Sequence, residues 1–197
     1  PAPAEGRPPP PRRRAHPHAQ PAVPVRSELA AAEPARLVAT LLETTEAALD
    51  RLKLSQLASL PTAAEAPRAD APAPQHWHVE IPLALGRETA VLALAVEREA
   101  PGRSGRAEEG ERIWRLRFAL DLPPLGPVHA LVTLQGHDVG VSLWAEREGT
   151  SRLLRRHADD LRAALADQAF TPGSVEIATG APPQRPTPAG HFLDRRP

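Results

Sequence analysis

The histidines of this sequence are the first candidates for chemistry. His76 and His78 stand two apart in a stretch whose alternation predicts a strand, so both imidazoles are expected on one face of it. A zinc site would use such a pair but needs further ligands of matching placement. The chain has no cysteine, and the nearest acid, Glu80, continues the polar edge of the same strand. We therefore expect neither a metal nor another cofactor.

The groups that could act in hydrolysis are spread along the chain. His137 and Asp138 fall in a predicted turn and Ser142 in the strand that follows, so a hydrolase would need a pocket that collects all three. Asp159 and Asp160 are adjacent in sequence and do not form the facing carboxylate pair that acid and base catalysis uses. The sequence also lacks a Gly-rich phosphate-binding motif. We expect no catalytic residue and no enzyme.

Composition indicates a small domain with long extensions. The 197 residues include 25 prolines and only 3% aromatic residues, a combination that leaves long segments unable to bury apolar surface. The 24 basic and 24 acidic residues balance, so we do not expect nucleic acid as a partner. The apolar runs are shorter than the roughly 20 residues of a spanning helix, so no stable membrane insertion is expected. Because the chain begins with Pro1 and lacks Met, we expect a fragment or a processed form.

The amino-terminal part is expected to hold one helix between Pro-rich segments. Prolines recur every few residues in residues 1–26, which predicts a disordered, extended segment. Residues 27–60 predict an amphipathic helix, since apolar side chains recur at steps of three and four from Val38 to Leu60. This stripe needs a partner, either the following domain or a second copy of the helix. Residues 61–75 predict an Ala/Pro linker.

From residue 76 the apolar period changes to two, which predicts strands. Two strands form a hairpin around a turn at residues 86–88, and a flexible loop at 101–110 leads to a third strand. In that third strand Arg115, Arg117 and Asp121 are expected in solvent, on the face opposite the core. The expected core face of the three strands carries Val79, Ile81, Leu83, Leu85, Ala90, Leu92, Leu94, Val96, Trp114, Leu116, Phe118, Leu120 and Leu122.

After a Pro-Gly break, the rest of the domain predicts two strands, a helix and a strand. Val128, Ala130, Val132 and Leu134 share a face of the first strand, and Val139, Val141, Leu143 and Ala145 share a face of the second. Thr150 or Ser151 is expected to cap a helix that runs to about Ala169, where Pro172 and Gly173 stop it. A short strand at 175–178 precedes a Pro-rich tail at 181–197. The fold class is therefore α+β: a small, twisted, mostly antiparallel sheet with one principal helix packed on it.

One part of this domain resembles a known family. The stretch Leu-Asp-Leu-Pro-Pro-Leu-Gly-Pro-Val at 120–128, followed by two alternating strands, is similar to the carboxy-terminal domain of flagellar hook-length control proteins (FliK). The helix that follows, the strand Ser-Val-Glu-Ile-Ala and the ending Gly-His-Phe-Leu-Asp-Arg-Arg are also similar to that family. The resemblance covers residues 76–197, with the domain itself at 76–180. The chain differs from the family at 168–170, where the family usually has a Gly and this chain has Gln-Ala-Phe.

The resemblance implies a role in export switching. Such a protein leaves the cytoplasm through the flagellar type III apparatus, and its disordered amino-terminal part senses hook length by contact with hook and hook-cap proteins. Its carboxy-terminal domain binds the cytoplasmic domain of the export gate protein FlhB and switches export from rod and hook subunits to filament subunits. A needle-length regulator of a virulence-type secretion system is the alternative. We expect a monomer.

The partner-binding surface is expected around the Pro-Gly break. Trp144 alternates away from the core face, where it either anchors an interface or is covered by the amino-terminal helix. The expected partner-binding residues are Leu122, Pro123, Leu125, Gly126, Val128 and Trp144.

Overall fold

The computed structural model describes residues 9–11, 16–24, 33–60, 75–99 and 112–183. Most of the predicted linker, the predicted loop at 101–110, most of the carboxy-terminal tail and parts of the segment 1–26 lie outside the described residues.

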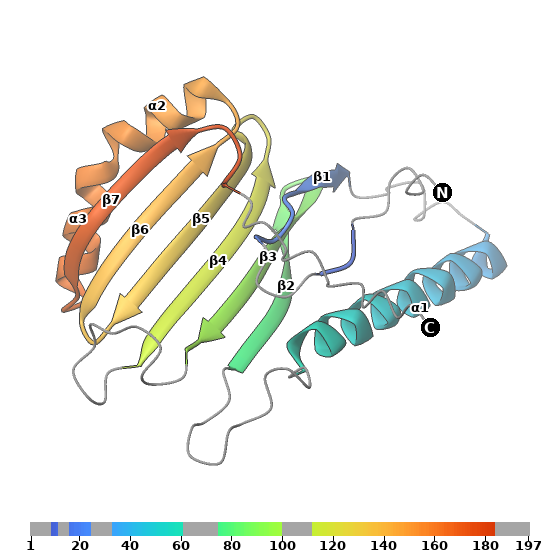
Figure 1. Ribbon diagram of the computed structural model, residues 1–197. Coiled ribbons are helices and arrows are strands. Elements are labelled where there is room, and N and C mark those ends of the chain that lie inside the picture. The colour runs from blue at the N-terminus through green and yellow to red at the C-terminus, as the bar shows by residue number, and fades with distance from the viewer. Residues whose placement is uncertain (1–8, 12–15, 25–32, 61–74, 100–111, 184–197) are drawn as a thin grey trace, which may run out of the picture.

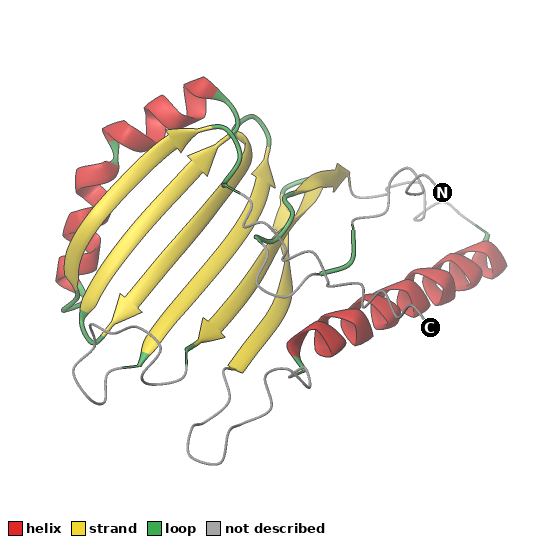
Figure 2. Cartoon of the chain, in the orientation of Figure 1, coloured by secondary structure: helices red, strands yellow, loops and turns green. Residues whose placement is uncertain are grey.

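The described residues form one twisted sheet with helices at its two ends (Figure 1). The elements are β1 (Gln20–Pro24), α1 (Pro34–Ser59), β2 (Gln75–Leu85), β3 (Glu88–Arg98), β4 (Ile113–Leu122), β5 (Gly126–Gln135), β6 (Asp138–Ala145), α2 (Glu148–Arg156), α3 (Ala158–Asp167) and β7 (Thr171–Thr179). The strand order is β1-β3-β4-β5-β6-β7, and β2 also pairs with β3. The β6–β7 pair is parallel and the other pairs are antiparallel, which confirms the predicted α+β class (Figure 2).

The two predicted hairpins, β2–β3 and β5–β6, are confirmed, and each has a glycine in its turn. Gly86 joins β2 to β3 with φ +62°, and Gly136 joins β5 to β6 with φ +59°. Positive φ is a conformation that glycine adopts without steric cost. The ladders then fix which side chains share a face, with Phe118 opposite both Leu94 and Ala130.

The apolar face of the sheet is covered at one edge and open at the other. α2 and α3 pack on β6 and β7 (Figure 1), where Val139 and Val141 are buried. At the opposite edge the prediction of a buried face on β2 is wrong, because α2 and α3 pack on β6 and β7 and α1 contacts β2 through Arg51 and Glu80, on the polar side of the sheet. Its apolar side chains are exposed at Trp77 (38%), Val79 (45%), Ile81 (40%) and Leu85 (42%).

The polar face is more buried than the sequence indicates. Arg117 is expected in solvent from the sequence, yet it is 4% exposed and its Nη1 donates a hydrogen bond of 3.0 Å to Glu97, which is 5% exposed. The reason is the amino-terminal segment, which returns over this face (Figure 1). Its residues Gln20–Pro24 form β1 beside β3, so the prediction of disorder through residue 26 is wrong for this strand.

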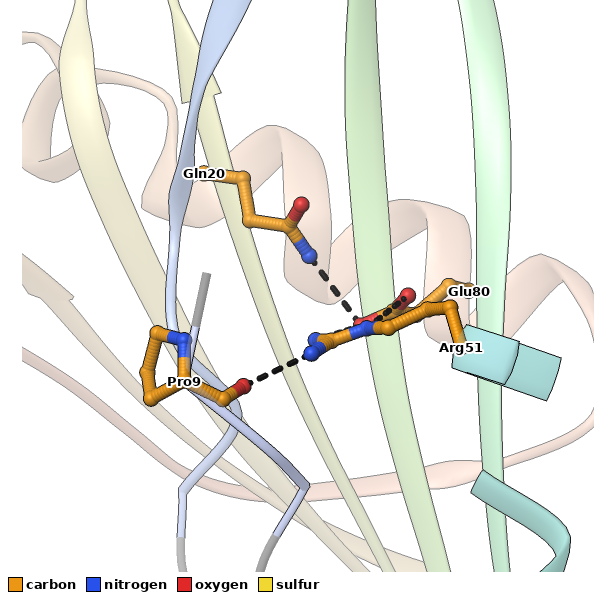
Figure 3. A network of polar contacts seen from close by, with 4 residues as sticks. All are labelled: Pro9, Gln20, Arg51 and Glu80. Carbon is orange, nitrogen blue, oxygen red and sulfur yellow. Dashed lines mark hydrogen bonds and ion pairs between the residues drawn. The ribbon is translucent and has the colours of Figure 1, made fainter. Parts of the chain in front are cut away.

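The predicted range 27–60 contains one helix, α1, which packs against β2, while residues 27–32 of that range lie outside the described residues. Pro34 lies in its first turn, where a missing N–H costs nothing. Arg51 of α1 donates to both carboxylate oxygens of Glu80 and to the Pro9 carbonyl oxygen, while Gln20 also donates to Glu80 (Figure 3). This network joins α1, β2 and the amino-terminal segment on the polar side of the sheet.

The predicted single helix is two helices. α2 begins at Glu148, so Thr150 and Ser151 lie inside it and do not cap it, and the chain breaks at His157 before α3. α3 ends at Asp167, and Ala169 adopts φ +62° close to where the family usually has a Gly. Pro172 and Gly173 do not stop the helix, because they already belong to β7.

Candidate partner-binding site

The turn between β4 and β5 presents a small proline-rich surface. Leu122 and Gly126 pair across the hairpin, and the three residues between them form the turn, with a cis Pro123-Pro124 bond. Pro123 and Pro124 are exposed, Leu125 is half-buried and Gly126 is buried. The exposed part of the site is therefore the two proline rings and one side of Leu125.

The start of α2 holds this turn in place. Arg147 Nη1 donates a hydrogen bond of 2.5 Å to the Pro124 carbonyl oxygen, and Thr150 Oγ1 donates one of 2.6 Å to the Leu125 carbonyl oxygen. Gly126 has φ +74°, and a Cβ placed there would lie 2.6 Å from Arg147 Nε. The turn thus depends on a glycine both for its backbone angle and for the close approach of Arg147. The sequence does not indicate that Arg147 holds this turn, and it predicts Thr150 as a helix cap instead.

The structure brings five of the six expected residues to this turn. Val128 pairs with Ala145 and lies on the apolar face, as Leu122 does. Trp144 pairs with His129 one position further along the same ladder, so it points to the opposite, polar face. There it meets the His16 ring edge-on, with centroids 5.5 Å apart. The sequence allows Trp144 either to anchor an interface or to be covered by the amino-terminal helix; it contacts the amino-terminal segment, which precedes that helix.

His129 is the titratable group closest to this tryptophan in the ladder. It is 7% exposed, and its Nε2 lies 3.8 Å from Oε1 of Glu146. Burial lowers the pKa of the His129 imidazole; the Glu146 carboxylate opposes this shift and the His18 ring adds to it. The contact between the amino-terminal segment and the sheet therefore favours a neutral His129.

The residues considered for hydrolysis do not come together. His137 lies in the β5–β6 turn and Asp138 begins β6, whereas Ser142 pairs with Leu131 in the middle of the sheet. At about 3.3 Å per residue, Asp138 and Ser142 are about 13 Å apart along the strand, beyond hydrogen-bond reach.

The histidine pair of β2 lies where the sequence predicts. The β2–β3 ladder puts His76 and His78 on the same face as Glu80, whose carboxylate oxygens accept hydrogen bonds from Arg51 and Gln20. Among the residues that the structure describes, no group of three or more His, Asp or Glu side chains is arranged to hold a metal ion.

Within the described ranges, none of the helices has the length and apolar character needed to cross a membrane.

One family model matches a part of this chain. Residues 102–186 match the family model of the flagellar hook-length control protein FliK. The resemblance drawn from residues 120–128 is confirmed over this range. No curated protein and no solved structure matches the chain.

The FliK match contains the whole candidate site. It includes the β4–β5 turn together with Arg147 and Thr150, which hold it, and it ends beyond β7. It leaves out α1, β2 and β3, which precede it in the chain. The description of the matched family names hook-length control and no enzymatic activity.

Proposed function

We propose that this chain acts in flagellar hook-length control and that its carboxy-terminal domain binds the cytoplasmic domain of the export gate protein FlhB. Binding switches export from rod and hook subunits to filament subunits. The observation that carries this proposal is the match of residues 102–186 to the FliK family model. The amino-terminal part would contact hook and hook-cap proteins after export through the type III apparatus.

The β4–β5 turn is the surface that we assign to gate binding. Its proline rings are exposed on a backbone that Arg147 and Thr150 hold in one conformation, so little conformational freedom would be lost on binding. Apolar rings with fixed geometry suit the buried centre of an interface. Trp144 is not part of this surface, because it points to the other face of the sheet.

A pull-down with the FlhB cytoplasmic domain tests the assignment. Leu125→Asp places a charge on the exposed side of the turn and should weaken binding roughly tenfold or more. His137→Asp is the matched control, because His137 is exposed in the turn at the other end of β5; it should bind like the parent chain. Leu125→Asp is preferable to Gly126→Asp, since Gly126 is buried and its substitution disturbs the turn. Full binding by a folded Leu125→Asp variant would show that the surface lies elsewhere.

A deletion strain tests the function itself. Loss of the length signal and of the switch should give very long hooks without filaments, and the parent gene should restore filaments. Filaments of normal number on normal hooks in the deletion strain would contradict the proposed function, whichever surface binds the gate.

A further inference from the structure

β3 and β4 part at one end of the sheet. Their ladder ends at the pair Ala93–Ala119, although β3 begins at Glu88 and β4 continues to Leu122. Because β2 pairs with β3 along its whole length, β4 leaves the other edge of this stretch of β3 open. β1 takes that edge and pairs there with Val91, and it also contacts β4. The amino-terminal segment is therefore inserted into an opening between two strands of the sheet.

The polar face of the sheet beside this opening has a floor of small side chains. Ala93, Ala95 and Ala119 lie on the same face as Glu80 and are exposed by 4%, 5% and 0%. Methyl groups project little from a sheet, so an extended segment can approach the backbone closely here. This floor has α1 and β2 on one side and Trp144 of β6 on the other, and together they form what we call the polar groove.

The chain's own amino-terminal segment lies in the polar groove (Figure 1). We call its described residues, 9–11 and 16–24, the strap. Half of them are prolines, namely Pro9, Pro10, Pro11, Pro17, Pro21 and Pro24. Prolines favour an extended backbone without internal hydrogen bonds. The carbonyl oxygens of such a backbone are available to donors of a binding partner.

One side of the groove contacts the strap through hydrogen bonds. Arg51 Nη1 donates one of 2.8 Å to the Pro9 carbonyl oxygen, and Glu80 Oε1 accepts one of 3.0 Å from Gln20 (Figure 3). Arg51 and Glu80 are themselves joined by an ion pair. This pair therefore offers the strap a donor for a backbone carbonyl and an acceptor for a side-chain amide.

The other side of the groove contacts the strap through an aromatic ring. His16 meets Trp144 edge-on, with centroids 5.5 Å apart. Proline-rich segments commonly bind in aromatic-lined grooves, because their preformed extended conformation loses little entropy on binding. With Trp144 and Arg51, the polar groove has both an aromatic wall and a donor for a backbone carbonyl.

The strap does not fill its groove. A cavity remains between the strap and the residues of α1, β2 and β3 beneath it. Pro9, Pro10 and His18 are exposed, and the exposed fraction of Val23 is 57%. The register of β1 shifts between Gln20 and Val23, so its pairing with β3 is interrupted. A segment held in this way can be displaced by another that makes the same contacts.

We propose that the polar groove binds proline-rich extended segments of partner proteins, and that the strap occupies it within the same chain until such a segment displaces it. The strap defines the ligand: an extended backbone with a carbonyl oxygen for Arg51, an amide side chain for Glu80 and a ring for Trp144. Because the strap is tethered, its local concentration is high and it blocks the groove to weak ligands. The proposal does not depend on gate binding.

A peptide that copies the strap tests this in the full-length chain. The probe is a synthetic, fluorescein-labelled peptide of residues 7–26, and fluorescence anisotropy measures its binding. In the strap variant, His16→Ala and Gln20→Ala together remove two contacts of the tethered segment. This variant should bind the peptide about tenfold or more tightly than the parent chain, because a blocked groove lowers the apparent affinity. Equal affinities would show that the strap does not occupy the peptide site.

A second peptide tests the chemistry of the ligand. Its prolines are replaced by alanine and its arginines are kept, so it has the same charge without the preformed extended backbone. It should bind the strap variant about tenfold or more weakly than the first peptide. Equal binding of both peptides would show that charge, and not the proline-rich backbone, carries the affinity. No binding of the first peptide up to millimolar concentration would exclude the groove as a peptide site.

Two tryptophan substitutions locate the peptide on the sheet. In the strap variant, Trp144→Ala should weaken peptide binding about tenfold or more. Trp77→Ala is the matched control, because Trp77 lies on the opposite face, where it stacks on Trp114; it should leave peptide binding unchanged. Circular dichroism verifies that both variants are folded. A folded Trp144→Ala variant that binds the peptide as before would place the site elsewhere.

A quenching measurement keeps Trp144 in place. Trp77→Phe and Trp114→Phe leave it as the one tryptophan of the full-length chain. Acrylamide should quench its fluorescence more strongly when the two strap substitutions are added, and saturating strap peptide should restore its protection. Unchanged quenching with the strap substitutions, or no restored protection with the peptide, would overturn the proposal.

Discussion

Replacing Gly126 with Ala should destabilise the domain through two separable effects. Gly126 has φ +74°, a conformation that costs a residue with a Cβ about 1–2 kcal/mol. The new Cβ would also lie 2.6 Å from Arg147 Nε, so the guanidinium has to move away from the Pro124 carbonyl oxygen. Arg147 is exposed, so this hydrogen bond is worth about 1 kcal/mol. Gly126→Ala should therefore lower the free energy of unfolding by about 2–3 kcal/mol.

Two further variants separate the effects. Arg147→Ala removes only the hydrogen bond and should cost about 1 kcal/mol. In the double variant the bond is lost once, so its cost should stay near about 2–3 kcal/mol and fall about 1 kcal/mol short of the sum of the single variants. Gly86→Ala serves as the control for backbone strain, because Gly86 has φ +62° and a Cβ placed there would have no atom within 4 Å; it should cost about 1–2 kcal/mol.

Urea unfolding followed by circular dichroism measures all four free energies. If the costs of Gly126→Ala and Arg147→Ala were additive, the two residues would not be coupled and Arg147 would not hold the turn. If Gly126→Ala cost no more than Gly86→Ala, the close approach of Arg147 would carry no energy. Either result would remove the physical basis for a preformed binding turn.

Three other predictions concern the rest of the sheet. Arg117→Leu leaves the buried Glu97 carboxylate without its guanidinium and should cost about 3–5 kcal/mol in urea unfolding, whereas Glu97→Leu combined with Arg117→Leu should cost far less. Burial lowers the pKa of His129, so below about pH 6.5 this side chain binds more protons in the unfolded chain than in the folded one. The contribution of His129 to the free energy of unfolding should therefore fall as the pH drops below about 6.5 and stay constant above it. His129→Gln should flatten this dependence in thermal melts. Ser151→Ala removes the hydroxyl contact of 2.7 Å to Thr179 and should lower the free energy of unfolding by about 1–2 kcal/mol.

The strands could be predicted from the sequence because their signals are local. Alternating apolar residues, interrupted by glycine at Gly86 and Gly136, are sufficient to place the hairpins β2–β3 and β5–β6. The same alternation assigns the side chains to the correct faces. It does not report how deeply each face is buried, because burial depends on which distant segment packs there.

Arg117 shows this limit most clearly. Its alternation with Leu116 and Phe118 is typical of a solvated strand face, and nothing in β4 indicates that the amino-terminal segment returns over it. The same long-range contact explains why β1 was missed. The five residues of β1 have no apolar alternation of their own and become a strand by pairing with the half of β3 that does not pair with β4.

The break at His157 did have a local signal. Arg155 and Arg156 end α2, and Asp159 and Asp160 lie in the first turn of α3. Basic residues are favourable at a helix carboxy terminus and acidic residues at an amino terminus, so this order of charges fits the end of one helix and the start of another. His157 Nδ1 lies 2.8 Å from Asp160 Oδ2, which joins the new helix to the break. The apolar pattern alone predicts one continuous helix, because the leucines of α2 and α3 continue with helical spacing.

The proposed gate-binding turn and the exposed apolar side chains of α1 and β2 belong to different parts of the chain. The FliK match covers β4 to β7 with α2 and α3, the part in which helices cover the apolar face and Arg147 and Thr150 hold the β4–β5 turn. The exposed apolar surfaces lie outside the match, on α1 and β2. Leu125→Asp should therefore weaken gate binding, whereas Ile81→Glu, at an exposed position outside the match, should leave gate binding unchanged in the same pull-down. If a folded Ile81→Glu variant lost gate binding while Leu125→Asp kept it, the gate-binding surface would have to lie on β2, and its assignment to the β4–β5 turn would be wrong.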